Sequence, residues 1–301
     1  MREDWVSTAR PNTTTAMSRD REPLIHPTAV IESGARLQSG VEVGAYSVVG
    51  PEVVLGEGAA IGHHVVLEGR VSAGRRVRIG HGSVIGSPPQ DLKFREGTPS
   101  GVAIGDDTVI REHVTIHRAT AENGWTRIGN GNLIMASSHI AHDCKIGDGA
   151  IIINYAGITG HVEVEDYAVV GGLSGIHPFV RIGAYAYIGG CSKVVQDVPP
   201  YVIADGNPAT ARSVNVVGLR RAGIEPGTRK AIRHAFRILY RSGLSPKSAL
   251  DQIRAEVPAS PFVNRLLEFI ESSTRGICGG LREPARLGVE GASISEDTRI
   301  L

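Results

Sequence analysis

The chain has 301 residues, enough for one large and one small domain, and its 32 Lys and Arg residues nearly balance 31 Asp and Glu. This balance gives no overall bias towards nucleic acid or an anionic membrane, and no apolar run approaches the roughly 20 residues of a membrane span. Three cysteines are too few and too scattered for a disulfide framework or a zinc knuckle, so we expect a reduced, cytoplasmic protein.

Residues 1–22 form the first segment of the chain. They are polar, rich in threonine, and lack the apolar core of a signal peptide. A segment of this composition buries too little apolar surface to fold on its own. We therefore predict a disordered N-terminal extension over residues 1–22.

From residue 23 to about residue 212, aliphatic residues recur with a period of six, as at Ile140, Ile146 and Ile152. Four residues after each aliphatic position stands a small or β-branched residue, such as Cys144, for which we expect a buried structural role. A period of six fits neither the 3.6 of a helix nor the 2 of a flat strand. It fits a chain that turns a corner every six residues.

Internal repeats of this kind take precedence over element-by-element assignment. Three six-residue sides close one triangular coil, and neighbouring coils pair as parallel strands roughly 4.8 Å apart. Both the aliphatic and the small positions then face the interior. The pattern predicts a mainly β protein with a parallel β-helix over residues 23–212, interrupted by excursions at 86–103 and 117–127, where binding function tends to lie.

After Ser213 the apolar spacing becomes helical. It predicts one helix from Pro226 to Arg241, and two more that begin at Ser245-Pro246 and Ser260-Pro261, where serine can cap the helix and proline fits its first turn. We expect a small helical domain over 213–275 that covers the end of the β-helix. Residues 276–301 return to glycine and polar residues and are predicted to form a flexible tail.

The most reactive cluster lies in the middle of the repeat. His142 stands two residues after an inward position, so its side chain is expected to face outward. One full coil, made of three six-residue sides, leads from His142 to Gly160 and from Asp143 to His161. The repeat therefore stacks two imidazoles, a carboxylate and a glycine amide within neighbouring coils.

This grouping suits acyl transfer to a hydroxyl group. A neutral imidazole at His142 can accept the hydroxyl proton, and Asp143 can hold its tautomer. The Gly160 amide can donate to the oxyanion of the tetrahedral intermediate. Zinc is the competing interpretation, because His139, His142 and His161 could supply three imidazole ligands.

Several longer motifs occur in order between residues 23 and 275. They are Gln90–Phe94, Ile110–Glu112, Val114–Arg118, His139–Cys144, Gly160–Val162 and Gln196–Ile203. Together they resemble the UDP-N-acetylglucosamine acyltransferases, a family of hexapeptide-repeat enzymes. The resemblance implies a left-handed β-helix and transfer of a 3-hydroxyacyl chain from acyl carrier protein to the sugar 3-hydroxyl, the first step of lipid A synthesis, with no metal or other cofactor.

The resemblance also implies residue roles. His142 would be the general base, Asp143 its support, and the Gly160 amide the oxyanion donor. Proline at 178 replaces a glutamine of the family. The implied substrate contacts are Asp91, Lys93, His139, His161 and His177, with Asn215 and Arg221 for the uridine diphosphate and Gly190 at the position that limits acyl length, where glycine suits longer chains.

Two kinds of partner follow from charge and surface. Residues 213–275 contain eleven Lys and Arg against five Asp and Glu. This excess of positive charge could simply be a solvated helix face. With the resemblance, it favours docking of an acidic carrier protein around Arg229 and Lys230. With the resemblance, a prism face that exposes aliphatic residues predicts a homotrimer with its sites between subunits.

Two other functions are weighed against this one. The related glucosamine N-acyltransferase carries a folded uridine-binding domain ahead of its repeat, for which residues 1–22 are too short. A catalytically silent scaffold does not account for the histidine cluster or for the Gln90–Phe94 motif.

Overall fold

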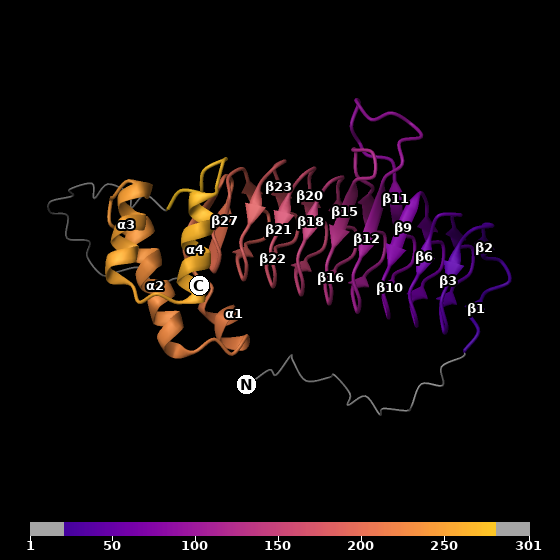
Figure 1. Cartoon of the computed structure of the whole chain (residues 1–301), viewed down its shortest axis with the longest axis horizontal. Helices are drawn as coiled ribbons and strands as arrows, with labels where there is room; N and C mark the ends of the chain where they lie inside the picture. Colours follow the sequence, from indigo (N-terminus) through magenta and orange to yellow (C-terminus); the bar gives the residue numbers. More distant parts are fainter. Residues whose placement is uncertain (1–20, 281–301) are drawn as a thin grey trace, which may run out of the picture.

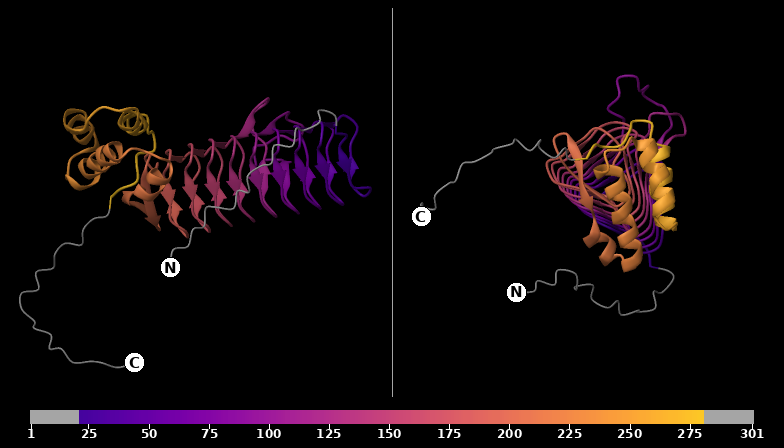
Figure 2. Two further views of the ribbon diagram at one scale, coloured as in Figure 1. Left: turned by 90° about the horizontal axis from the view of Figure 1, so that it is seen from below. Right: turned by 90° about the vertical axis from the view of Figure 1, so that its left-hand side faces the viewer.

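The computed structural model describes residues 21–280. From Leu24 to Val194 the chain winds as a left-handed parallel β-helix with a triangular cross-section (Figures 1 and 2), which confirms the predicted fold class. Each side of the prism is a sheet in which every third strand along the chain is paired in parallel. A coil without excursions therefore consists of three six-residue sides, as the register pairing of Ile140 with Ile158 shows.

The three sides of the prism are three sheets. The first sheet contains β1 (Leu24–Ile25), β4 (Glu42–Val43), β7 (Ala60–Ile61), β10 (Arg78–Ile79), β13 (Val109–Ile110), β16 (Leu133–Ile134), β19 (Ile151–Ile152), β22 (Val169–Val170), β25 (Tyr187–Ile188), β27 (Val202–Gly206) and β28 (Ala209–Val214). The second contains β2 (Val30–Ile31), β5 (Val48–Val49), β8 (Val66–Leu67), β11 (Val84–Ser87), β14 (Thr115–His117), β17 (His139–Ile140), β20 (Gly157–Ile158), β23 (Gly175–Ile176) and β26 (Lys193–Val194). The third contains β3 (Arg36–Leu37), β6 (Val54–Leu55), β9 (Arg70–Ala73), β12 (Gly101–Ile104), β15 (Trp125–Ile128), β18 (Lys145–Ile146), β21 (Glu163–Val164) and β24 (Arg181–Ile182).

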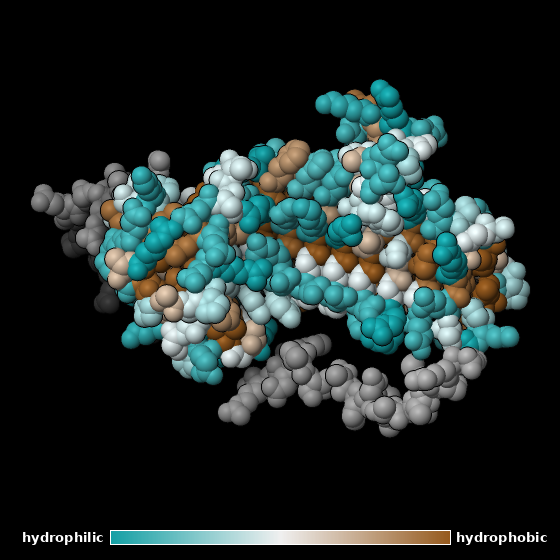
Figure 3. All heavy atoms as spheres, viewed as in Figure 1, coloured by the Kyte–Doolittle hydropathy of each residue, from teal (hydrophilic) through white to brown (hydrophobic). Residues whose placement is uncertain are grey.

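The interior of the prism is filled as the period predicts. Ile140, Ile152 and Ile158 are fully buried, and so is Cys144 at the small position, where burial raises the pKa of the thiol to about 12. Burying each large aliphatic side chain contributes about 1.5–3 kcal/mol, so the stack of isoleucines is the main source of stability. Figure 3 shows a narrow apolar band along the prism on one face, with hydrophilic side chains on both sides.

Two excursions leave the prism, and both are shorter than predicted. They span residues 88–100 and 118–124, because the flanking residues extend the strands β11, β12, β14 and β15. The longer one projects from the prism near β11 (Figure 1). Their bases are tied together, since the Asn123 N–H donates to the Pro99 carbonyl (2.6 Å) and the Gly101 N–H to the Gly124 carbonyl (3.0 Å).

The β-helix ends before residue 212. After β26 the chain forms an antiparallel hairpin, β27 and β28, that extends the first sheet. Four helices follow at the end of the prism (Figure 1): α1 (Val216–Arg221), α2 (Pro226–Arg241), α3 (Pro246–Glu256) and α4 (Pro261–Glu271). The last three confirm the sequence prediction, including capping by Ser245 and Ser260.

Both predicted tails lie mostly outside the described residues, at 1–20 and 281–301. Where the structure describes their inner ends, the prediction of disorder is wrong. The Arg21 carbonyl accepts from the Gly40 N–H (2.7 Å). At the other end, the Cys278 N–H donates to the Asp197 carbonyl (2.8 Å), and bridges join Ile277 to Asp197 and Gly280 to Ala211, so residues 276–280 pair with the segment that follows the prism instead of starting a tail. In residues 21–280, no helix combines the length and apolarity needed to cross a bilayer.

Candidate active site

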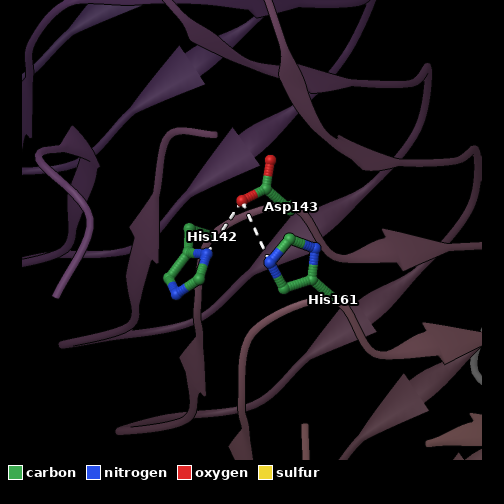
Figure 4. A group of neighbouring side chains, drawn as sticks. All are labelled: His142, Asp143 and His161. Atoms are coloured by element: carbon green, nitrogen blue, oxygen red, sulfur yellow. Dashed lines mark hydrogen bonds and ion pairs between the residues drawn. The ribbon is translucent and has the colours of Figure 1, made fainter. Parts of the chain in front are cut away.

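His142 and Asp143 lie at the corner after β17 (His139–Ile140). Asp143 has a left-handed backbone with φ of 59°, which belongs to the tight corner of the coil. Its Oδ2 atom lies 2.8 Å from Nδ1 of His142 (Figure 4). Both side chains are largely buried. The adjacent residues thus form a hydrogen-bonded imidazole–carboxylate pair.

The carboxyl group of Asp143 is held in its ionised form. Burial opposes ionisation, but hydrogen bonds from His142 and Thr120 outweigh it and lower the pKa of the Asp143 carboxyl. Since a carboxylate can only accept, Nδ1 of His142 carries the proton of this hydrogen bond. In the neutral imidazole, Nε2 therefore keeps its lone pair and can act as a base.

Gly160 lies directly beside the His142 ring, one coil further on. A Cβ atom built on Gly160 would be 2.5 Å from Cε1 of His142, so only glycine leaves room for the imidazole. At another corner, Asn130 occupies the same position of its six-residue repeat as Gly160. Its backbone N–H donates to Oδ1 of Asp148, one coil further on (2.6 Å). The next coil after Gly160 carries Pro178 instead, and among residues 21–280 the Gly160 N–H has no hydrogen-bond acceptor. This amide is therefore available to a ligand.

His161 stands on the other side of the same carboxylate. Its Nε2 atom is 3.7 Å from Oδ2 of Asp143 (Figure 4), and its ring stacks on Phe179 with centroids 4.5 Å apart. The structure thus brings together His142, Asp143, Gly160 and His161, as predicted from the six-residue period.

The three histidines proposed for zinc do not converge. His139 directs Nδ1 to the Thr115 hydroxyl at 2.7 Å. Within the described residues, the group whose donor atoms lie within 4.8 Å of one another is His142, Asp143 and His161. The zinc alternative with three imidazoles is therefore wrong in its ligand set.

His117 extends the cluster and was not among the predicted site residues. Its ring packs edge-to-face on His139 with centroids 4.8 Å apart, and its buried Nδ1 atom has no partner in the described residues. Burial, with the nearby His139 and His142, lowers the pKa of His117 to about 4, and burial also lowers the pKa of His139. Both rings are thus neutral at neutral pH. The sequence feature that could have indicated this role is the position of His117 directly after the inward Ile116.

The low pKa of His117 makes stability depend on pH. Because the pKa of His117 falls from 6.5 to about 4 on folding, the unfolded chain binds more protons than the folded chain between these pH values. The free energy of unfolding should therefore fall as the pH is lowered from about 6.5 towards 4. We expect a His117→Gln variant to show a smaller fall, measured as urea midpoints at several pH values in this range. Identical pH slopes for the two proteins would contradict the prediction.

Asp91 and Lys93 lie on the excursion of residues 88–100. The Lys93 N–H donates to Oδ1 of Asp91 (2.9 Å), and both residues line a surface hollow. Thr120, from the second excursion, lines the same hollow and also donates to Asp143. The hollow with the predicted substrate contacts therefore adjoins the imidazole–carboxylate pair.

His177 is held by a residue that the sequence did not single out. Nη2 of Arg275 lies 3.1 Å from Nδ1 of His177, and it also donates to the Val195 carbonyl (3.2 Å). A guanidinium can only donate, so Nδ1 of His177 carries the lone pair and the neutral ring presents an Nε2–H donor.

The remaining predicted contacts lie elsewhere in the single chain. Gly190 follows β25 of the first sheet, whereas His142 follows a strand of the second. Asn215 caps α1 by accepting from the Gly218 N–H (2.9 Å), and its Nδ2 donates to the Tyr185 carbonyl (2.9 Å). Arg221 is exposed at the end of α1, on the far end of the prism from β1 (Figure 1). One chain alone does not join these residues to His142.

A β-helix built from six-residue repeats, with an imidazole–carboxylate pair at one corner, is typical of the hexapeptide-repeat transferases. The family model for bacterial transferase hexapeptides matches residues 126–160, and the model "Udp N-acetylglucosamine O-acyltransferase; Domain 2" matches residues 197–278. An acyl-[acyl-carrier-protein]–UDP-N-acetylglucosamine O-acyltransferase from Thermodesulfovibrio yellowstonii is 48% identical over 255 residues, covering 84% of this chain and 98% of the relative. The chain belongs to the UDP-N-acetylglucosamine O-acyltransferase family.

Solved structures agree with this assignment. The structure of LpxA from Acinetobacter baumannii superposes with a TM-score of 0.82 at 42% identity, covering 85% of this chain and 99% of that one. The UDP-N-acetylglucosamine acyltransferase from Campylobacter jejuni gives a TM-score of 0.80 at 38% identity, with the same coverage.

Proposed function

We propose that the protein transfers a 3-hydroxyacyl chain from acyl carrier protein to the 3-hydroxyl of UDP-N-acetylglucosamine, the first step of lipid A synthesis. The observation that carries this proposal is the His142–Asp143 pair beside the free Gly160 amide, in a chain 48% identical to an enzyme named for this reaction. The test is incubation with both substrates and mass spectrometry of the product from a mixture of acyl donors. Absence of an acylated nucleotide sugar would refute the proposal.

The geometry supports a direct mechanism. Nε2 of His142 takes the proton of the sugar hydroxyl as its oxygen attacks the thioester carbonyl, and Asp143 stabilises the imidazolium that forms. The Gly160 N–H donates to the oxyanion of the tetrahedral intermediate. When the intermediate collapses, the C–S bond breaks and the imidazolium returns its proton to the departing thiolate.

The other predicted residues fit substrate recognition. Asp91, Lys93, His139, His161 and His177 supply donors and acceptors for the sugar and the acyl chain. Asn215 and Arg221 would contact the uridine diphosphate, where the planar guanidinium suits phosphate oxygens. At Gly190 the nearest atom to a built Cβ is the Gly172 carbonyl oxygen at 3.3 Å, and no other atom lies within 4 Å, so the surface over Gly190 is otherwise open to an acyl chain.

The site is proposed to be completed in a homotrimer. Val109, Leu133, Ile151 and Val169 stand at outward positions of the first sheet, where they form a row of half-buried aliphatic side chains. A symmetric assembly would cover this row and bring the Asn215 and Gly190 corners of one chain towards the His142 corner of another. Sedimentation as a monomer at assay concentration would count against this arrangement.

The carrier protein is proposed to dock on α2. Lys230, Arg233, Arg237 and Arg241 line one hollow there, together with Phe236. Their positive field should steer an acidic partner. The three cysteines, all free thiols, agree with a cytoplasmic location, where such a partner is expected.

Charge reversal tests this docking face. We expect the pair Lys230→Glu and Arg233→Glu to raise KM for acyl carrier protein by about 10-fold or more at low salt, with kcat unchanged, because long-range attraction is lost. The difference should shrink as salt increases. Lys247→Glu, a single charge reversal on the neighbouring exposed surface of α3, is the control, and it is compared with Lys230→Glu alone as well as with the pair. An unchanged KM would show that the cations of α2 are only a solvated helix face.

A further inference from the structure

Thr120 makes more contacts with the catalytic carboxylate than any other residue of the described chain. Its hydroxyl donates to Oδ2 of Asp143 (2.7 Å), and its backbone N–H lies 3.1 Å from Oδ2 and 3.2 Å from Oδ1. Thr120 belongs to the second excursion, residues 118–124, and not to the coils of the prism.

The carboxylate of Asp143 lies close to two imidazoles. Oδ2 lies 2.8 Å from His142 and 3.7 Å from His161 (Figure 4). Rotation about the last side-chain torsion of Asp143 would move Oδ2 away from one ring and towards the other. The two donors of Thr120 hold both oxygens in place, and so they keep the short contact on His142.

Thr120 is itself held from the first excursion. The Ser100 hydroxyl, at the end of residues 88–100, donates to the carbonyl of Ala119 (2.5 Å). Thr120 then forms part of the hollow that contains Asp91 and Lys93. A continuous set of hydrogen bonds therefore connects the substrate-binding excursion with the carboxylate.

We propose that Thr120 is a positioning residue of the acyl transfer reaction, which fixes the Asp143 carboxylate on His142 and ties it to the excursion that carries Asp91 and Lys93. This inference rests on the proposed function of His142 and Asp143. Thr120 acts through Asp143, so its loss should lower kcat while leaving KM for both substrates nearly unchanged.

The test compares Thr120→Val, which keeps the shape and loses the hydroxyl donor, with Thr120→Ser, which keeps the donor. A hydrogen bond to a charged group is worth about 1.5–3 kcal/mol, so we expect kcat of Thr120→Val to fall about 10-fold or more, with KM within about 2-fold. Thr120→Ser should restore most of kcat. A wild-type kcat for Thr120→Val would overturn the proposal.

A double-mutant cycle separates positioning from general damage. In an Asp143→Ala background, Thr120→Val should cause almost no further loss, whereas a purely structural role would give the same loss again. Thr108→Val is the matched control, because the buried Thr108 hydroxyl donates to the Gly129 carbonyl (2.8 Å), at a corner of the prism outside the site. It should lower stability and leave kcat unchanged.

The outcomes distinguish the two proposals. If Asp143→Ala keeps full activity, the catalytic pair fails and the role of Thr120 fails with it. If Asp143→Ala loses activity while Thr120→Val does not, only the role of Thr120 is refuted.

Discussion

Replacing His142 by alanine is expected to lower kcat by at least about 10²-fold, because the variant has no group to accept the proton of the attacking hydroxyl. KM should change little, since the ring acts in the transition state more than in binding. The measurement is steady-state kinetics with both substrates, with circular dichroism to show that the variant is folded. The ring is largely buried at a corner and fills no part of the apolar interior, so the fold should persist.

A matched histidine serves as control. His81 occupies the same position of an earlier coil, two residues after the inward Ile79, and its Nδ1 accepts from the His63 N–H (2.8 Å). His81→Ala removes an imidazole from the same kind of corner without touching the site, and kcat should remain near that of the wild type. Equal rates for wild type and His142→Ala would exclude His142 from the mechanism.

Gly160→Ala is expected to reduce kcat almost as strongly as loss of His142. The added methyl carbon would lie 2.5 Å from Cε1 and 2.8 Å from Nε2 of the imidazole, so the ring must leave its present position. Misplacement of a reacting group by about 1 Å can cost about 10²-fold in rate. Because the atoms in contact belong to a side chain that can rotate, the cost in stability should be small.

The measurement is kcat together with the urea midpoint of unfolding. Gly279→Ala is the control, because a Cβ at Gly279 meets no atom within 4 Å. A Gly160→Ala enzyme with wild-type kcat would show that the imidazole does not work from the position seen here. A large loss of stability would instead show that the backbone at this corner cannot accept a side chain.

The prism was predictable because its rule is local and repeats. Each coil buries the same two positions, so Ile140 and Cys144 report the inward face without knowledge of any distant contact. The C-terminal helices α2 to α4 were also predictable from their apolar spacing and serine caps. Helix α1 was not, because it has only 6 residues, too few for a periodic signal, and its cap Asn215 is held by the Tyr185 carbonyl of the prism.

The residues of the candidate site also fall into a predictable group and an unpredictable group. Gly160 and His161 could be placed beside His142 and Asp143 by adding one whole coil, because no excursion interrupts the coils between them. Thr120 is 23 residues before Asp143, which is not a whole coil, since Thr120 itself lies in the excursion of residues 118–124. The same excursion lengthens this coil, so His139 pairs in register with Thr115, 24 residues earlier, and lies beside His117, on the same strand as Thr115. Residues that reach the site from an irregular loop therefore escape any argument from the period.

The parallel stacking of equal coils also has a geometric consequence for evolution and design. Each coil of the chain touches only the coils before and after it, so one complete coil of three six-residue sides can be inserted between Phe179 and Val194 without disturbing the imidazole–carboxylate corner. Each added coil would move the helical end about 4.8 Å further along the axis. Insertion or deletion of coils can therefore change the distance between the proposed carrier docking face and the reacting atoms only in steps of this size.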